Sequence, residues 1–163
     1  ALARTRAARL TTFRLVDIRV AGIDDAHALA GLRAVWNGGD EPDFEQRMAA
    51  WLADEGDRRT TWLAAIDDAP VGMASMLEYR RMPRPGRPDS RWGYVSNMFV
   101  REDVRNRGVG SALLAAVIAA ADERDYVRLV LSPSPRSVPF YERAGFVVPD
   151  ERAGDHRLLV RSV

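Results

Sequence analysis

One stretch, residues 100–114, constrains the fold and function of this chain more than any other. It reads Val-Arg-Glu-Asp-Val-Arg-Asn-Arg-Gly-Val-Gly-Ser-Ala-Leu-Leu and follows an apolar segment, residues 92–100, that predicts a β-strand. An alanine- and leucine-rich run to about Arg124 then predicts a helix. The order is strand, turn and helix, with Gly108 and Gly110 at the start of the helix.

This glycine turn is suited to bind an anion. Gly108 and Gly110 have no Cβ, so the backbone amides can point into one concavity that a ligand can approach closely. The first turn of a helix adds unpaired amides and the positive end of its dipole. Arg101, Arg105 and Arg107 supply charge-assisted donors at the rim. We infer that the ligand carries a di- or polyphosphate.

The residue pattern distinguishes three kinds of phosphate-binding turn. A P-loop requires Gly-Lys-Ser/Thr, and this chain contains no lysine. A dinucleotide fingerprint requires a third glycine where Leu113 stands. The segment Arg105-Asn-Arg-Gly-Val-Gly110 instead fits the pattern Arg/Gln-x-x-Gly-x-Gly/Ala. On this motif the chain resembles the GNAT superfamily of N-acetyltransferases, in which such a turn grips the pyrophosphate of acetyl-coenzyme A.

A second motif lies about thirty residues further on. The segment Pro139-Phe-Tyr-Glu-Arg-Ala-Gly-Phe146 resembles the family's motif in which a short helix ends and the chain re-enters the sheet. The two motifs occur in the family's order and at a similar separation, and the resemblance extends more weakly over residues 13–161. It implies a single α/β (α+β) domain with a mixed, mostly antiparallel central sheet flanked by helices.

Composition excludes several classes of protein. The 163 residues suit one domain, and 24 basic against 23 acidic residues give a net charge of +1, which does not indicate a nucleic-acid partner. Zero cysteines exclude disulfides, thiolate metal sites and a cysteinyl acyl-enzyme. We find no apolar run long enough for a membrane span and no secretory signal. We therefore expect a cytoplasmic protein with a frayed extension, residues 1–10, before an acetyltransferase domain, residues 11–163.

Periodicity and breakers predict the elements in order. We expect a first strand buried on both faces, an antiparallel hairpin with a tight polar turn, an arginine-rich loop that is either solvated or a flap, and a short helix beginning at Ser137. Trp36 and Trp51 are expected in the core. The predicted strands are residues 13–20, 60–66, 70–79, 92–100 and 126–131, with a terminal hairpin of 146–148 and 156–160; the predicted helices start near 23, 42, 108 and 137, and the loop is 80–91.

The resemblance also assigns the cofactor site. The strand before the turn would bind the pantetheine through its main chain, and the turn would bind the pyrophosphate. Ser134 and Pro135 stand where the family often has an asparagine, which leaves an amide contact there without its usual side chain. The implied cofactor-binding residues are Met98, Phe99, Val100, Arg105, Asn106, Arg107, Gly108, Val109, Gly110, Ser111, Ser134 and Tyr141.

Three catalytic services remain after cofactor binding. By resemblance, the Met98 amide would face the thioester oxygen, and Tyr141 would protonate the leaving thiolate. The general base stays open, because Tyr94 and Ser96 stand where family members carry Glu or His. Glu78, or a water chain ending at Ser96, could substitute for it. His27 and His156 lie off the motifs and are expected to be structural.

The acceptor is not identified by the sequence. The resemblance makes Trp36, Asn37, Asp40 and Phe44 candidates to contact it, with Tyr94, and the acidic residues 40–43 suggest a cationic amine or simply a helix N-terminus. We expect direct acetyl transfer to a primary amine of a small molecule or peptide, and a homodimer by resemblance only. The alternatives are a non-catalytic acyl-CoA sensor of the same fold and a protein that binds ATP at the glycine turn.

Overall fold

The computed structural model describes residues 15–39, 41–148 and 159–162, which form one sheet covered by helices on both faces. The strand order follows the chain order, and every pairing is antiparallel except the parallel pair β4–β5. The predicted mixed, mostly antiparallel sheet is therefore confirmed. The strands are β1 (Val16–Val20), β2 (Arg59–Ile66), β3 (Ala69–Arg80), β4 (Arg91–Val100), β5 (Arg128–Leu131) and β6 (Leu159–Ser162).

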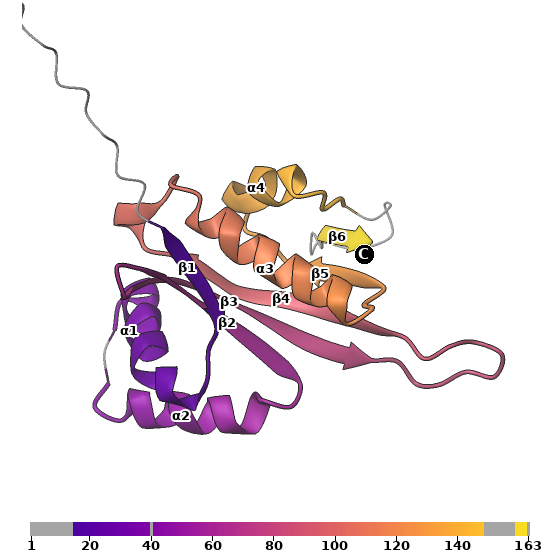
Figure 1. The fold of residues 1–163 in the computed structure, drawn as a ribbon, viewed down its shortest axis with the longest axis horizontal. Coiled ribbons are helices and arrows are strands. Elements are labelled where there is room, and N and C mark those ends of the chain that lie inside the picture. The colour runs from indigo at the N-terminus through magenta and orange to yellow at the C-terminus, as the bar shows by residue number, and fades with distance from the viewer. Residues whose placement is uncertain (1–14, 40, 149–158, 163) are drawn as a thin grey trace, which may run out of the picture.

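The α-helices of the described segments form two groups (Figure 1). The first pair, α1 (Ala26–Asn37) and α2 (Phe44–Glu55), covers one face of the sheet; α3 (Val109–Glu123) and α4 (Val138–Arg143) cover the other. Gly38 and Gly145 follow the ends of α1 and α4 in left-handed conformations, with φ of 70° and 86°. None of the helices that the structure describes is both long and apolar enough to cross a bilayer.

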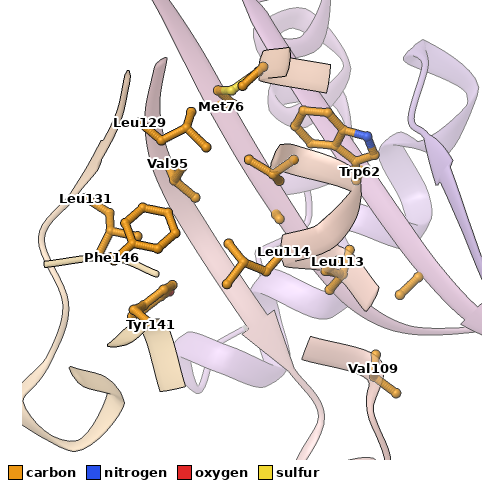
Figure 2. Close-up of a cluster of buried hydrophobic side chains, with 14 of the residues drawn as sticks. Trp62, Met76, Val95, Val109, Leu113, Leu114, Leu129, Leu131, Tyr141 and Phe146 are labelled. Atoms are coloured by element: carbon orange, nitrogen blue, oxygen red, sulfur yellow. The ribbon is translucent and has the colours of Figure 1, made fainter. Parts of the chain in front are cut away.

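The larger core lies between the sheet and α3 (Figure 2). Val109, Leu113, Val117 and Ala121 form the buried stripe of α3 and are each at most 1% exposed. Leu114 joins them, and Tyr141 and Phe146 close the cluster beside Leu131. A second, smaller cluster lies beneath α1 and consists of Leu29, Leu32, Leu63, Met73 and Phe99.

The β2–β3 hairpin and the loop after β3 also follow the sequence. Asp67 and Asp68 form the tight turn with φ of 50° and 63°, the left-handed pair that suits a two-residue hairpin connection. Residues 81–90, between β3 and β4, are irregular, and nearly all of them are exposed. In Figure 1 this loop extends far beyond the body of the sheet.

One expectation about the strands was wrong. The first strand is not buried on both faces: β1 is an edge strand that pairs only with β2, so Val16 and Ile18 pack on the core while Val20 is 57% exposed. Of the predicted terminal hairpin, the described residues show one antiparallel bridge, Val147 to Val160, and β6 also pairs along its length with β5. Residues 149–158 and Phe13 lie outside the described residues.

Candidate active site

A wedge-shaped opening forms where β4 and β5 diverge. Their parallel pairing covers only Gly93 with Leu129 and Tyr94 with Val130, yet β4 continues to Val100. A bulge bends β4 beyond this point: Ser75 pairs with Ser96 and Met73 with Phe99, so two residues of β4 face one of β3. Asn97, in the bulge, has φ of 53°. The backbone of residues 97–98 is thereby released from the regular ladder and lines the opening.

The opening leads into a cavity of about 750 Å³, which we name the β4–β5 cleft. Its walls come from the end of β4, the glycine turn, the segment after β5 and α4. The cleft brings together most of the residues that the sequence assigned to the cofactor. It is lined by Trp36, Val95, Ser96, Asn97, Met98, Phe99, Val100, Arg105, Asn106, Gly108, Gly110, Ser111, Leu131, Ser132, Pro133, Ser134, Ser137, Phe140, Tyr141 and Arg143.

The glycine turn has the backbone geometry of an anion cradle. Asn106 and Gly108 have φ of 61° and 86°, and Gly108 is the N-cap residue of α3. The amides of Val109, Gly110 and Ser111 are in the first helical turn and have no intrahelical acceptor. A Cβ on Gly110 would lie 3.6 Å from the Phe140 ring, so larger side chains there would have to enter the cleft.

Arg105 fastens this turn to β4. Its Nε donates to the Val100 carbonyl at 3.0 Å and its Nη1 to Glu102 Oε1 at 2.8 Å. Two predicted cofactor residues present no side chain to the cleft. Arg107 is exposed and lies outside the lining, and the Val109 side chain is buried in the α3 core, which leaves only its amide at the turn.

Tyr141 is both a core residue and a wall of the cleft. The residue is 7% exposed, and its ring meets Phe140 and Phe146 edge to face, with centroids 4.9 and 5.8 Å away. Figure 2 shows it beside Phe146, on the α4 side of the cluster. Burial raises the pKa of Tyr141 to about 12. Among the described residues its hydroxyl has no hydrogen-bond partner, so this proton is available to a group in the cleft.

A second cavity, of about 810 Å³, lies between the sheet and the α1–α2 pair, and we name it the α2 cavity. It shares Ser96 and Asn97 with the β4–β5 cleft, so the two cavities meet at the bulge of β4. The predicted acceptor residues Phe44 and Tyr94 line it. The full lining is Leu29, Arg33, Phe44, Arg47, Met48, Ala50, Trp51, Asp54, Arg59, Thr61, Met73, Ser75, Leu77, Tyr79, Tyr94, Ser96 and Asn97.

A row of hydroxyl side chains crosses the floor of the α2 cavity. Thr61, Ser75 and Ser96 are register neighbours on β2, β3 and β4, and the Thr61 and Ser75 oxygens are 3.0 Å apart. Arg59 Nη1 donates to Ser96 Oγ at 3.4 Å, and Asn97 Nδ2 donates to the same atom at 3.5 Å. The Ser96 oxygen therefore accepts from cationic and amide donors at the point where the cavities meet.

The two tryptophans do not take the expected core positions. Trp36 is 40% exposed, lines the β4–β5 cleft and stacks on Phe99. Trp51 lines the α2 cavity, with Arg59 over its ring at 5.2 Å. Both helices pack on the smaller core through other residues, and each tryptophan lies beside that core, in a cavity wall. Asn37 is exposed and lines neither cavity, and Asp40 lies outside the described residues.

Glu78 is not brought to the site, because it lines neither cavity. It accepts hydrogen bonds from Tyr126 Oη and Arg80 Nε, each at 2.6 Å, and Arg91 lies 3.6 Å away. Burial alone would raise the pKa of Glu78, but the bonds from Tyr126 and Arg80 outweigh it and hold that pKa below its ordinary value. His27 pairs with Glu45 on the exposed surface, and His156 lies outside the described residues.

Sequence reasoning missed Arg33, Arg59 and Asn97. Arg33 Nη1 donates to Asn97 Oδ1 at 3.2 Å, and its guanidinium lies 4.8 Å from the centre of the Trp36 ring. Asparagine tolerates left-handed φ, so Asn97 inside a strand pattern was the available signal for the bulge. The two arginines carried no local signal, because their role depends on the packing of α1 and α2 over the sheet.

Several known proteins are similar to this chain in sequence or in fold. Residues 25–146 match the model of the acetyltransferase (GNAT) family. The chain is 29% identical over 122 residues to the uncharacterized N-acetyltransferase YafP of Escherichia coli (strain K12), covering 71% of this chain and 69% of YafP. It is 30% identical over 76 residues to glucosamine 6-phosphate N-acetyltransferase of Trypanosoma brucei brucei, covering 47% of this chain and only 50% of that enzyme.

A solved structure agrees with both matches. A predicted acetyltransferase from Clostridium acetobutylicum, crystallised with acetyl-CoA, superposes with a TM-score of 0.68 at 22% identity, over 85% of this chain and 94% of the other. At this identity the superposition demonstrates the shared fold alone. The family match spans most of the chain and includes both the glycine turn and the Tyr141 motif. The chain therefore belongs to the GNAT acetyltransferase family.

Proposed function

We propose that this protein is an acetyl-CoA-dependent N-acetyltransferase that moves the acetyl group directly to a primary amine. The observation that carries the proposal is the meeting of two cavities at the β4 bulge, at Ser96 and Asn97. One cavity has the anion cradle and the other has no cradle of that kind in its lining. A cofactor entering through the first and an amine entering through the second would meet at the strand between them.

The cleft residues fit coenzyme A by shape and chemistry. The amides of residues 109–111 and the Arg105 guanidinium supply donors for a pyrophosphate. The backbone of residues 98–100 can pair with the amides of the pantetheine arm, and Trp36 offers an exposed ring face at the mouth. When bound, acetyl-CoA supplies an activated thioester, and the Met98 amide in the bulge would donate to its oxygen.

The proton steps divide between a tyrosine and solvent. Tyr141 is proposed to protonate the leaving thiolate because its hydroxyl lines the cleft and carries its proton at neutral pH. Its raised pKa makes this transfer uphill, so the step depends on a positioned hydrogen bond to the sulfur. Among the described residues that line the two cavities, Asp54 alone carries a carboxylate, and it is exposed. We propose that the amine loses its proton to solvent along the hydroxyl row that ends at Ser96, which positions water rather than acting as a base.

Thiol release from acetyl-CoA over a panel of primary amines tests this function. We expect release that depends on the amine, and calorimetric heat when coenzyme A is added to the purified chain. No carboxylate or imidazole of residues 15–39, 41–148 or 159–162 lies at the bulge, which favours the second candidate, an acyl-CoA sensor without turnover. Tight coenzyme A binding without release above the rate of Tyr141→Phe would establish the sensor. Absence of binding would reject both functions.

A further inference from the structure

The α2 cavity carries an excess of positive charge. Its lining contains Arg33, Arg47 and Arg59 but, among the described residues, one carboxylate, Asp54. The acidic residues Glu41 and Asp43 at the start of α2 do not line it, and Glu41 is engaged with Arg47. A cationic amine would therefore find a single described carboxylate, Asp54, in the cavity lining, against three arginines.

Arg59 is held where its charge faces the bulge. Its side chain is 16% exposed, its Nε pairs with Glu55 Oε2 at 2.9 Å, and its guanidinium covers the Trp51 ring. This arrangement turns Nη1 toward Ser96 Oγ, at 3.4 Å. Glu55 is also paired with Arg58, so one carboxylate is shared by two guanidinium groups. Arg59 is thus incompletely neutralised on the side that faces the cavity.

Arg33 approaches the same point from α1. Its Nη1 donates to Asn97 Oδ1 at 3.2 Å, and its guanidinium lies against Trp36. No described carboxylate forms an ion pair with it. Two guanidinium groups therefore converge on adjacent residues of the bulge, and a planar fork of donors in a partly desolvated cavity prefers a carboxylate or phosphate oxygen to water.

Part of the cavity wall away from the bulge is apolar. Phe44, Met48, Trp51, Met73 and Leu77 line it away from the bulge. An acceptor that fills the cavity would thus place an anionic group at the two arginines and an apolar or aromatic body beneath α2. Since both arginines contact the bulge residues themselves, the anionic group must lie within a few bonds of the reacting amine.

We infer that the acceptor is an amine with an adjacent carboxylate or phosphate-type group and an apolar body, as in an apolar α-amino acid. Arg33 and Arg59 bind the anionic group and orient the amine at Ser96 and Asn97. This inference rests on the proposed acetyl transfer, whose chemistry it leaves unchanged: the amine nitrogen forms the amide bond, the thioester bond breaks, and the sulfur leaves as a thiol. The inference adds to the proposed function the class of amine that the cavity selects.

Matched substrates test the inference on the full chain. Phenylalanine and 2-phenylethylamine differ only in the carboxylate, and 1-amino-2-phenylethylphosphonic acid replaces that carboxylate by a phosphonate. We expect kcat/KM for at least one of the two anionic amines to exceed that for 2-phenylethylamine by about tenfold or more, the range of a charge-assisted hydrogen bond. Comparison of phenylalanine with the phosphonate then identifies which anion the site prefers.

Variants separate charge from packing. Arg33→Gln and Arg59→Gln should each raise KM for the anionic amine about tenfold more than they raise KM for 2-phenylethylamine. Arg59→Lys should retain part of the preference because it retains the charge. Arg58→Gln is the matched control: Arg58 shares Glu55 with Arg59 but does not line the cavity. Equal KM values for the charged and neutral amines, or equal losses for both in the variants, would overturn the inference while acetyl transfer stands.

A binding measurement covers the case in which no amine is acetylated. If coenzyme A binds without thiol release, the proposed function fails, and calorimetric titration of the three compounds into the coenzyme A complex decides the inference alone. Binding of an anionic amine that is lost in the Arg33→Gln, Arg59→Gln double variant sustains the charged pocket. Equal binding of the neutral compound, or binding of none of the three at millimolar concentration, overturns it.

Discussion

Trp36 of α1 stacks on Phe99 of β4, with the ring centroids 5.3 Å apart and the ring planes 13° from parallel. The stack ties the first helix to the bulged end of the strand that separates the two cavities. Phe99 is 6% exposed, whereas Trp36 is 40% exposed and lines the β4–β5 cleft. The Phe99 ring is thus fixed in the smaller core and holds the Trp36 ring in place as part of the cleft wall.

Truncation of Trp36 should therefore weaken coenzyme A binding more than it destabilises the fold. We expect Trp36→Ala to raise the coenzyme A dissociation constant about tenfold, because a large aromatic contact surface at the mouth of the cleft is lost. Isothermal titration calorimetry measures this change. Val35→Ala is the control, because Val35 is the neighbouring residue on α1, is 63% exposed and does not line the cleft. Equal affinities of the two variants would contradict a ligand contact for Trp36.

Gly110 should discriminate sharply between small and large replacements. A methyl group there makes ordinary contact with Phe140 and Val100, at 3.6 and 3.7 Å, so Gly110→Ala should retain coenzyme A binding. Gly110→Leu must place its larger side chain in the cleft above the cradle, and we expect binding to fall by at least about a hundredfold. Thermal unfolding of both variants controls for damage to α3. If Gly110→Leu binds coenzyme A as tightly as Gly110→Ala does, the glycine turn is not part of the cofactor site.

The part of the site carried by local backbone chemistry was predictable from sequence. Gly108, Gly110 and the segment around Tyr141 lie in short motifs whose geometry depends on neighbouring residues only, and the structure brings them into one cleft. The buried stripe of α3 was predictable because residue periodicity reports which face of a helix is buried, whereas the mixed, mostly antiparallel sheet was implied by the resemblance to the GNAT superfamily.

The rest of the site depends on contacts between distant segments. Arg33, Arg59 and Ser96 come from α1, β2 and β4, and only the packing of α1 and α2 over the sheet gathers them around one cavity. The same packing explains why Trp36 and Trp51 line cavities rather than fill a core. For Glu78, nothing in the sequence revealed that Tyr126 and Arg80 occupy its oxygens.

Tyr141→Phe should separate binding from turnover. The phenyl ring preserves the contacts with Phe140 and Phe146, so we expect coenzyme A affinity to change little, while loss of the proton donor lowers kcat about a hundredfold. Steady-state kinetics at saturating cofactor measure this effect. Tyr126→Phe is the matched control, because that buried hydroxyl bonds Glu78 and lines neither cavity. If both variants lose the same activity, Tyr141 is not the proton donor.

The pH dependence of the rate should follow the substrate. Because no described carboxylate or imidazole lies at the bulge, the amine must lose its proton to solvent before it attacks. We expect log kcat/KM to rise with a slope of about one up to the pKa of the acceptor amine. Two acceptors with different amine pKa values should shift the inflection by that difference. An inflection at one fixed pH for both amines would instead reveal a base within the protein, with Asp54→Asn as the first variant to measure.

The buried phenol of Tyr141 also predicts a loss of stability in alkali. Burial raises its pKa to about 12, whereas an unfolded chain has a phenol pKa near 10. Below pH 10 both states are protonated and the contribution is complete. Between pH 10 and 12 the unfolded chain ionises while the folded protein does not, so up to about 3 kcal/mol of unfolding free energy is lost as the pH rises through the folded pKa.

Urea denaturation of wild type and Tyr141→Phe between pH 8 and 12 measures this contribution. The wild-type free energy of unfolding should fall more steeply than that of the variant, because phenylalanine has no proton to lose. The contributions of the other tyrosines are the same in both proteins and cancel in the comparison. They include Tyr126, whose pKa is raised mainly by burial and also by its bond to Glu78. If the two curves stay parallel up to pH 12, the Tyr141 hydroxyl is exposed to water in solution, and the cleft wall that it forms is more open than the structure describes.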